Sequence, residues 1–160
     1  MEMKEIGLWN DKYKSWIPAD FSDMEEKDIR LRYPMNMRPE VIKQSKDQLC
    51  EFNFSKNVVG TYENIVEQLR DKVKKYFNMT HLIKEINEDF VIEDEYSNLA
   101  KGFCCMKEIM EQKWFCAFCY KQIGQEIINI SITCRMEQKE EYFKTFKQCV
   151  SWTQSNTGRR

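Results

Sequence analysis

The sequence has few of the residues that interrupt secondary structure. It contains 5 glycines and 3 prolines in 160 residues. This scarcity argues against long structureless linkers, and a chain of this length suits one domain with a buried core. We therefore predict a single globular domain over residues 1–154, followed by a disordered polar tail over residues 155–160.

Neither sign of charge is in excess, and long apolar runs are missing. The 26 acidic and 25 basic side chains give a net charge of -1, so nothing attracts the whole molecule to nucleic acid or to an anionic membrane. No apolar run approaches the roughly 18 residues of a membrane span, and residues 1–5 lack the apolar segment of a signal peptide. We expect a cytoplasmic protein with no nucleic-acid partner and no membrane insertion.

Recognisable catalytic chemistry is scarce as well. The only histidine, His81, follows a predicted helix, where a C-terminal cap or a surface position is commoner than catalysis. No G-x-S-x-G, P-loop or G-x-G-x-x-G motif occurs. We therefore expect no catalytic residue and no cofactor.

The 7 cysteines are an odd number, and most lie in apolar or strand-like runs, which favours reduced thiols acting as small hydrophobic residues. Cys116 and Cys119 have the spacing of a redox or zinc pair. However, residues three apart on a strand point to opposite faces, and no second ligand pair has suitable spacing. We expect buried structural cysteines and no metal, with redox or metal chemistry as the alternative.

The chain is organised around residues 114–136, which read as two strands joined by a turn near Gly124. Residues 114–120 are apolar on both faces, as in a strand that is covered on both sides. Residues 128–136 alternate between apolar and polar, which predicts one core face. This hairpin should form the centre of a sheet.

Helices should cover that sheet. Thr61 caps a strongly amphipathic helix ending at Asn78, and residues 138–152 form a second amphipathic helix. Ser22 and Glu25 have the spacing of a capping box for a short helix. Further strands are predicted over residues 4–10, 14–17, 41–45, 48–55, 82–86, 90–93 and 99–108, with turns at residues 10–12, 46–47 and 87–89. The fold class is thus α/β (α+β): an α/β/α sandwich with a twisted, mostly antiparallel central sheet.

Aromatic side chains are dense in the first quarter of the chain, and Met35 and Met37 lie beside Arg38 in a proline-flanked connector. Such residues fill small cores, but exposed ones form adaptable binding surfaces. We predict a partner-binding surface in this region and keep the core as the alternative. Its residues are Trp9, Trp16, Phe21, Met35, Met37 and Arg38.

One segment of the chain reads Trp16-Ile17-Pro18-Ala19-Asp20-Phe21 and is followed by Tyr33-Pro34 and by Arg38-Pro39-Glu40-Val41-Ile42. This segment resembles the PsbP-like superfamily. The closing strands and terminal helix, which ends Cys149-Val150-Ser151-Trp152, are similar too. That superfamily includes DcrB-like bacterial proteins and type VI secretion chaperones of the same fold, and small uncharacterised Firmicutes proteins are the nearer likeness. The resemblance implies no catalytic residues and a fold that is used for binding.

Three functions of different class remain open. The leading one is a non-enzymatic protein-interaction module of bacterial type, either a secretion adaptor or chaperone or an immunity-type inhibitor, with an unknown protein partner. Residues 93–95 and 137–141 would then offer acidic faces to a basic partner. The alternatives are a carrier of an apolar small molecule and an enzyme of unrecognised type. An exposed aromatic groove would favour the first, an enclosed apolar cavity the second, and a cleft of convergent polar groups the third.

Overall fold

A large antiparallel sheet forms the centre of the molecule. The computed structural model describes residues 1–34, 38–57, 63–79 and 83–156. Among these residues, seven strands make up the large sheet. In spatial order they are β3 (Ser22–Asp23), β4 (Val41–Gln44), β5 (Cys50–Asn57), β9 (Glu126–Arg135), β8 (Gln112–Ile123), β7 (Leu99–Ile109) and β6 (Ile83–Glu93).

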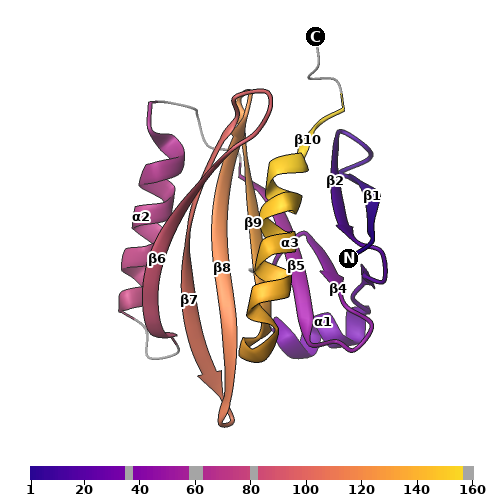
Figure 1. Ribbon diagram of the computed structural model, residues 1–160, viewed down its shortest axis with the longest axis vertical. Coiled ribbons are helices and arrows are strands. Elements are labelled where there is room, and N and C mark those ends of the chain that lie inside the picture. Colours follow the sequence, from indigo (N-terminus) through magenta and orange to yellow (C-terminus); the bar gives the residue numbers. More distant parts are fainter. Residues whose placement is uncertain (35–37, 58–62, 80–82, 157–160) are drawn as a thin grey trace.

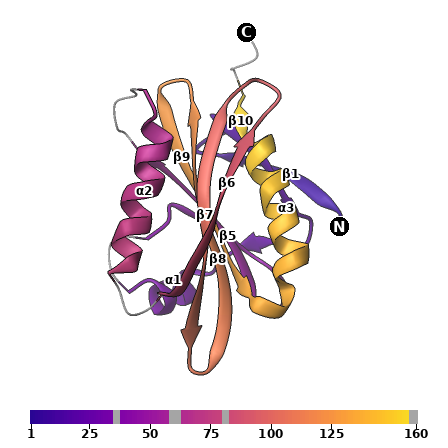
Figure 2. The same ribbon diagram turned by 60° about the vertical axis from the view of Figure 1, so that its left-hand side comes forward.

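A smaller sheet and the helices surround it. The smaller sheet has β2 (Tyr13–Pro18) between β1 (Met3–Leu8) and β10 (Gln154–Ser155). The helices are α1 (Glu26–Arg32), α2 (Ile65–Asn78) and α3 (Lys139–Trp152), and a 3-10 turn, η1 (Met136–Gln138), leads into α3. Figures 1 and 2 show α2 and α3 on opposite sides of the large sheet. The predicted α/β/α sandwich is therefore confirmed.

The central strand β8 is covered on both faces, as its sequence predicts. On one face Phe115, Ala117 and Cys119 join the main core, in which α3 packs against both β9 and β2. On the other face Tyr120 packs with Ile65 and Val66 of α2. A strand that is apolar on both sides thus carries a helix on each side.

The main core is built around aromatic side chains from distant parts of the chain. The Phe52 ring lies 5.0 Å from that of Phe21 and 5.6 Å from that of Phe146, both edge-on. All three side chains are fully buried, as are Ile130 and Ile132 of β9. This core fixes α3 between the two sheets.

Several local predictions are wrong for identifiable reasons. The Ser22 capping box does not form, because residues 22 and 23 pair with β4 and α1 begins at Glu26 without a side-chain cap. The turn predicted at residues 87–89 is instead part of β6, where the register shifts between Ile86 and Asp89. Irregular strands and turns contain the same kinds of polar residue, so the sequence did not distinguish between the two structures. Thr61 and His81 lie outside the described residues.

The ordered chain continues past the predicted boundary at residue 154. Ser155 pairs with Tyr13 of β2, and the Asn156 amide donates to the Lys12 carbonyl at 3.0 Å. This pairing holds the C-terminal end of α3 against the small sheet, which matters for the site described next.

Candidate functional site

The predicted partner-binding residues lie in different environments. Phe21 has no exposed surface, so it belongs to the core and is not a partner contact. Trp9 is half-buried against Tyr13, with ring centroids 5.8 Å apart. Trp16 and Arg38 line two different surface hollows. Met35 and Met37 lie outside the described residues.

The first hollow is an aromatic groove where the small sheet meets the C-terminal end of α3. Its volume is about 490 Å³. The Trp16 and Trp152 rings meet edge-to-face with centroids 5.8 Å apart. Trp152 is 41% exposed and Tyr96 39%, which is unusual for such large rings. The groove is lined by Met3, Trp16, Glu95, Tyr96, Ser151, Trp152 and Gln154.

A buried lysine builds this groove. Lys121 Nζ, which has no exposed surface, lies 2.8 Å from Asp94 Oδ2 and donates to the carbonyls of Val150 and Thr153 at 2.8 and 2.7 Å. One ammonium thus joins the C-terminal end of β8, the end of α3 and the turn between β6 and β7. The groove residues flank these partners in sequence: Glu95 and Tyr96 follow Asp94, and Trp152 precedes Thr153.

Asp94 also orders its own turn. One carboxylate oxygen, Oδ1, accepts from the backbone amides of Tyr96 and Asn98, both at 2.9 Å. Although burial acts to raise it, the hydrogen bonds and charge of Lys121 together with the Asn98 amide hold the pKa of Asp94 below its ordinary value. Burial lowers the pKa of Lys121, and Asp94 opposes that effect. The acidic face predicted at residues 93–95 is therefore reduced to Glu93 and Glu95, because Asp94 is buried and paired.

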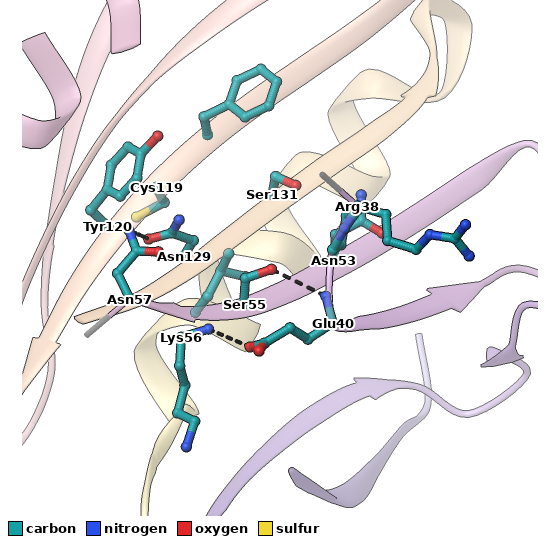
Figure 3. A pocket seen from close by; sticks show the side chains of 13 residues that line it. Arg38, Glu40, Asn53, Ser55, Lys56, Asn57, Cys119, Tyr120, Asn129 and Ser131 are labelled. Atoms are coloured by element: carbon teal, nitrogen blue, oxygen red, sulfur yellow. Dashed lines mark hydrogen bonds between the residues drawn. The ribbon is translucent and has the colours of Figure 1, made fainter. Parts of the chain in front are cut away.

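The second hollow lies on the face of the large sheet that carries α2, over β5 and β9. Its volume is about 440 Å³, and Figure 3 shows the small polar side chains that form it. Asn53, Ser55, Asn129 and Ser131 are among these side chains, and Phe118 and Tyr120 of β8 stand beside them. We call this hollow the sheet-face pocket.

Beneath one end of the sheet-face pocket lies a buried carboxylate, Glu51. Tyr33 Oη donates to Glu51 Oε2 at 2.5 Å, Asn53 Nδ2 donates to the same oxygen at 2.9 Å, and Arg32 pairs with Oε1. Burial, followed by the charge of Glu51, raises the pKa of Tyr33, so the phenol stays protonated and keeps donating. Each carboxylate oxygen has a partner, so Glu51 is a structural group.

The cysteines lie as their strand positions predict. Cys116 packs with Phe103 and Cys105 on the α2 side, whereas Cys119 belongs to the main core on the α3 side. All seven cysteines are buried and unpaired. Within the described residues, no group of three histidine, cysteine or carboxylate side chains is arranged to hold a metal ion. No helix in that part of the chain combines the length and hydropathy of a membrane span.

Comparison with known proteins identifies the architecture. No family model and no curated protein sequence matches the chain. Among solved structures, PsbP (CyanoP) from Synechocystis sp. PCC 6803 aligns over 96% of this chain and 92% of its own, with a TM-score of 0.61 at 8% identity. The chain has a PsbP-like fold.

Other proteins share this PsbP-like fold. The Ran-binding protein Mog1p of Saccharomyces cerevisiae aligns over 96% of this chain and 95% of its own, with a TM-score of 0.65 at 8% identity. LpqN of Mycobacterium tuberculosis, described as involved in cell envelope biogenesis, aligns over 96% of this chain and 91% of its own, with a TM-score of 0.63 at 6% identity. At such identities the likeness concerns the fold, which confirms the resemblance predicted from the sequence; the DcrB-like grouping stays a prediction.

The sequence missed most of the aromatic groove. Trp16 was predicted as a partner-binding residue and Glu95 as part of the acidic face at residues 93–95, but Tyr96 and Trp152 were not predicted. Only the topology brings these segments together. Lys121 gave one usable signal: it interrupts the apolar alternation of β8 between Cys119 and Ile123, at a position that should face the core. A lysine at such a position predicts a buried partner.

Proposed function

We propose that this protein is a non-enzymatic protein-interaction module that binds its partner through the aromatic groove. The observation that carries the proposal is the contact between the half-buried Trp16 and the exposed Trp152, with the exposed Tyr96 and Glu95 in the same hollow. Tryptophan and tyrosine dominate the binding energy of protein interfaces, whereas solvent-exposed tryptophans in a small domain need a reason. The groove is lined by α3, the small sheet and the turn that follows β6, and Lys121 joins that turn to the end of α3.

The chemistry of the groove favours a partner that presents a lysine or arginine side chain. Aromatic faces attract cations, and the exposed carboxylate of Glu95 adds a negative charge that attracts a lysine or arginine side chain. Lys14 Nζ already lies 5.6 Å from the Trp16 ring centroid, which shows that this ring accepts a cation from its own chain. A basic partner agrees with either an adaptor or an immunity-type inhibitor.

The structural neighbours support binding as a use of this fold, since Mog1p is described as Ran-binding. We extend this to the present chain as a bacterial secretion adaptor, chaperone or immunity-type inhibitor. A cytoplasmic location fits seven buried, unpaired thiols, because unpaired cysteines are kept in reducing compartments.

The two alternative functions have less support. An apolar carrier requires an enclosed apolar cavity, whereas both hollows described above open at the surface and include polar side chains. The sheet-face pocket does gather polar groups, as an enzyme would. However, its carboxylate Glu40 accepts from the Lys56 amide at 2.7 Å, and most of its floor is amide and hydroxyl groups that do not titrate near neutral pH.

The test is affinity capture from the native host with matched variants. Tagged wild type is compared with Trp152→Ala and Glu95→Gln in the groove, and with Tyr76→Ala as a control. Tyr76 is also an exposed aromatic residue, 64% exposed, but lies on α2 at the other face of the large sheet. A specific partner should be retained by wild type and Tyr76→Ala and lost from Trp152→Ala.

Titration of the captured partner in purified form then measures the effect. We expect Trp152→Ala to weaken binding by about 30-fold, the scale of an interface hot spot. Glu95→Gln should weaken it about fivefold, and Lys14→Ala should strengthen it because the competing cation is removed. A partner that binds Trp152→Ala and wild type equally would refute the groove as the binding site. Measurable turnover of a substrate would refute the non-enzymatic assignment.

A further inference from the structure

The sheet-face pocket has a floor whose pattern is set by strand register. Ser131 of β9 lies opposite Asn53 of β5 on one side and Phe118 of β8 on the other. Asn129, two residues earlier, lies opposite Ser55 and Tyr120. Two parallel rows therefore cross three central strands, and each runs from small amide or hydroxyl side chains to an aromatic ring.

This composition is unusual for the middle of a seven-stranded sheet. On the opposite face the same strands carry fully buried residues such as Phe52, Phe54, Ile130 and Ile132. On this face α2 packs against β6, β7 and β8 and covers Tyr120 with Ile65. The small polar side chains of β5 and β9 lie beside the helix and leave a pocket of about 440 Å³.

The charged groups around the pocket are engaged elsewhere. Arg38 donates to Glu26 at 3.2 Å, and in Figure 3 its side chain extends away from the pocket. Lys56 Nζ lies 5.2 Å from the Trp9 ring centroid and 3.8 Å from Glu126. Glu40 receives the Lys56 backbone amide, and its own amide donates to Ser55 Oγ at 3.2 Å. The two rim cations are thus paired with carboxylates, the Glu40 carboxylate accepts a backbone amide, and the floor is neutral.

Hydrogen-bonding groups remain on that floor. Asn129 uses Oδ1 to accept from Asn57 at 3.2 Å, which leaves its Nδ2 donor without a described partner. Asn53 donates through Nδ2 to Tyr33 and Glu51, while its Oδ1 is buried with no partner among the described residues. Burial raises the pKa of Tyr120, so that phenol also stays neutral. The pocket therefore offers uncharged donors and acceptors beside aromatic carbon.

We propose that the sheet-face pocket binds a neutral saccharide. A sugar ring presents hydroxyl groups, which match the amide and hydroxyl floor, and an apolar face, which matches the partly exposed Phe118 side chain. An anionic ligand would lack a free cation here, and an apolar ligand would bury the polar floor without hydrogen bonds. The volume lies within the range of small-molecule sites, about 300–1,000 Å³. This inference does not depend on the aromatic groove.

Saturation-transfer NMR on the purified protein tests the proposal. The probes are glucose, N-acetylglucosamine and maltose, with glucose 6-phosphate as the charged comparison. We expect at least one neutral sugar to bind with a Kd of about 1 mM or lower, and glucose 6-phosphate to bind more weakly than glucose. Absence of a signal from all three neutral sugars, or preference for the phosphorylated one, would overturn the proposal.

Paired variants locate the binding. Ser131→Ala should weaken sugar binding about fivefold by removing one hydrogen bond, and Asn129→Asp should weaken it further by replacing a donor with a charge. Asn78→Asp is the matched control, since it makes the same change at an exposed position on α2. Trp152→Ala should leave sugar binding unchanged, so failure of the groove proposal and failure of this one are distinguishable. Equal binding by Ser131→Ala, Asn129→Asp and wild type would also overturn it.

Discussion

Lys121 and Asp94 form an ion pair in which both side chains are buried, with Nζ and Oδ2 separated by 2.8 Å. Burying two charges away from water costs folding free energy unless the remaining hydrogen-bond donors and acceptors of both groups have partners. Here they are: the ammonium also donates to backbone carbonyls at the end of α3, and the carboxylate also accepts from backbone amides of its own turn. The pair therefore joins the core to the aromatic groove.

Replacing Lys121 by methionine should destabilise the protein strongly. Methionine has a similar length but leaves Asp94 as an unpaired buried charge, which costs about 3–5 kcal/mol of unfolding free energy. Urea denaturation measures this loss. Lys113→Met is the control, because Lys113 lies on the same strand but is exposed, and it should change the unfolding free energy by less than about 0.5 kcal/mol. Equal stability of both variants would show that the pair is not structural.

The same pair predicts how stability depends on acid. The pKa of Asp94 lies below its ordinary value of 3.8 in the folded protein, so the unfolded chain binds more protons as the pH falls. This contribution to stability is complete above pH 3.8 and is lost as the pH falls through the folded pKa. Asp94→Asn should be less stable at pH 7, but its stability should fall less steeply between pH about 4 and 2. Parallel curves for the variant and wild type would contradict the assignment.

Arg32 and Arg38 provide a contrast between an arginine that pairs with a buried carboxylate and one that pairs with an exposed carboxylate. Arg32 pairs with Glu51, which is 1% exposed, whereas Arg38 pairs with the exposed Glu26 at 3.2 Å. Arg32→Ala should cost about 2–3 kcal/mol by leaving a buried carboxylate short of a partner, and Arg38→Ala should cost less than about 1 kcal/mol. Thermal or urea unfolding of the two variants measures the difference. If Arg38→Ala lowered the unfolding free energy more than Arg32→Ala, the prediction would be wrong and the Arg38 ion pair would be structural.

The cysteines should be unreactive until the protein unfolds. All seven are buried, and burial raises the pKa of Cys104 to about 12 and that of Cys149 to about 11, so these two thiols hold little thiolate at neutral pH. The hydrogen bond from Cys105 lowers the pKa of Cys116 to about 7, but that thiol is 1% exposed, so a reagent cannot reach it in the folded protein. A thiol-specific reagent such as DTNB should label the native protein slowly and titrate seven thiols in denaturant. One thiol that reacts in the native state as fast as free cysteine would indicate redox chemistry instead.

The sequence predicted the layers of the fold because they follow from hydrophobic periodicity. The strand that is apolar on both faces and the two amphipathic helices determine the sandwich, and residues 139–152 form α3 almost as predicted. Phe21 was misassigned because an aromatic residue in a short, proline-rich segment looks the same whether it is core or surface; only its contact with Phe52 decides. The groove could not be predicted, since Trp16, Tyr96 and Trp152 meet only through the tertiary fold.

The acidic segment at residues 93–95 shows a second limit. Three adjacent acids in a turn usually indicate a solvated surface, yet Asp94 is buried because it pairs with Lys121 of β8, a strand that β7 separates from β6. Such long-range pairing has no local signature. Glu95, by contrast, is exposed and lines the groove, as the predicted acidic face requires.

Site-specific photo-crosslinking in the native host tests the binding site most directly. A benzophenone amino acid replaces Tyr96 in the aromatic groove or, as a control, Tyr76 on α2; both positions are exposed aromatic residues, at 39% and 64%. If the groove binds the partner, illumination should give one discrete covalent adduct from position 96 and none of that mass from position 76. An adduct of the same partner from position 76 alone, or from neither position although the partner is captured, would contradict the account.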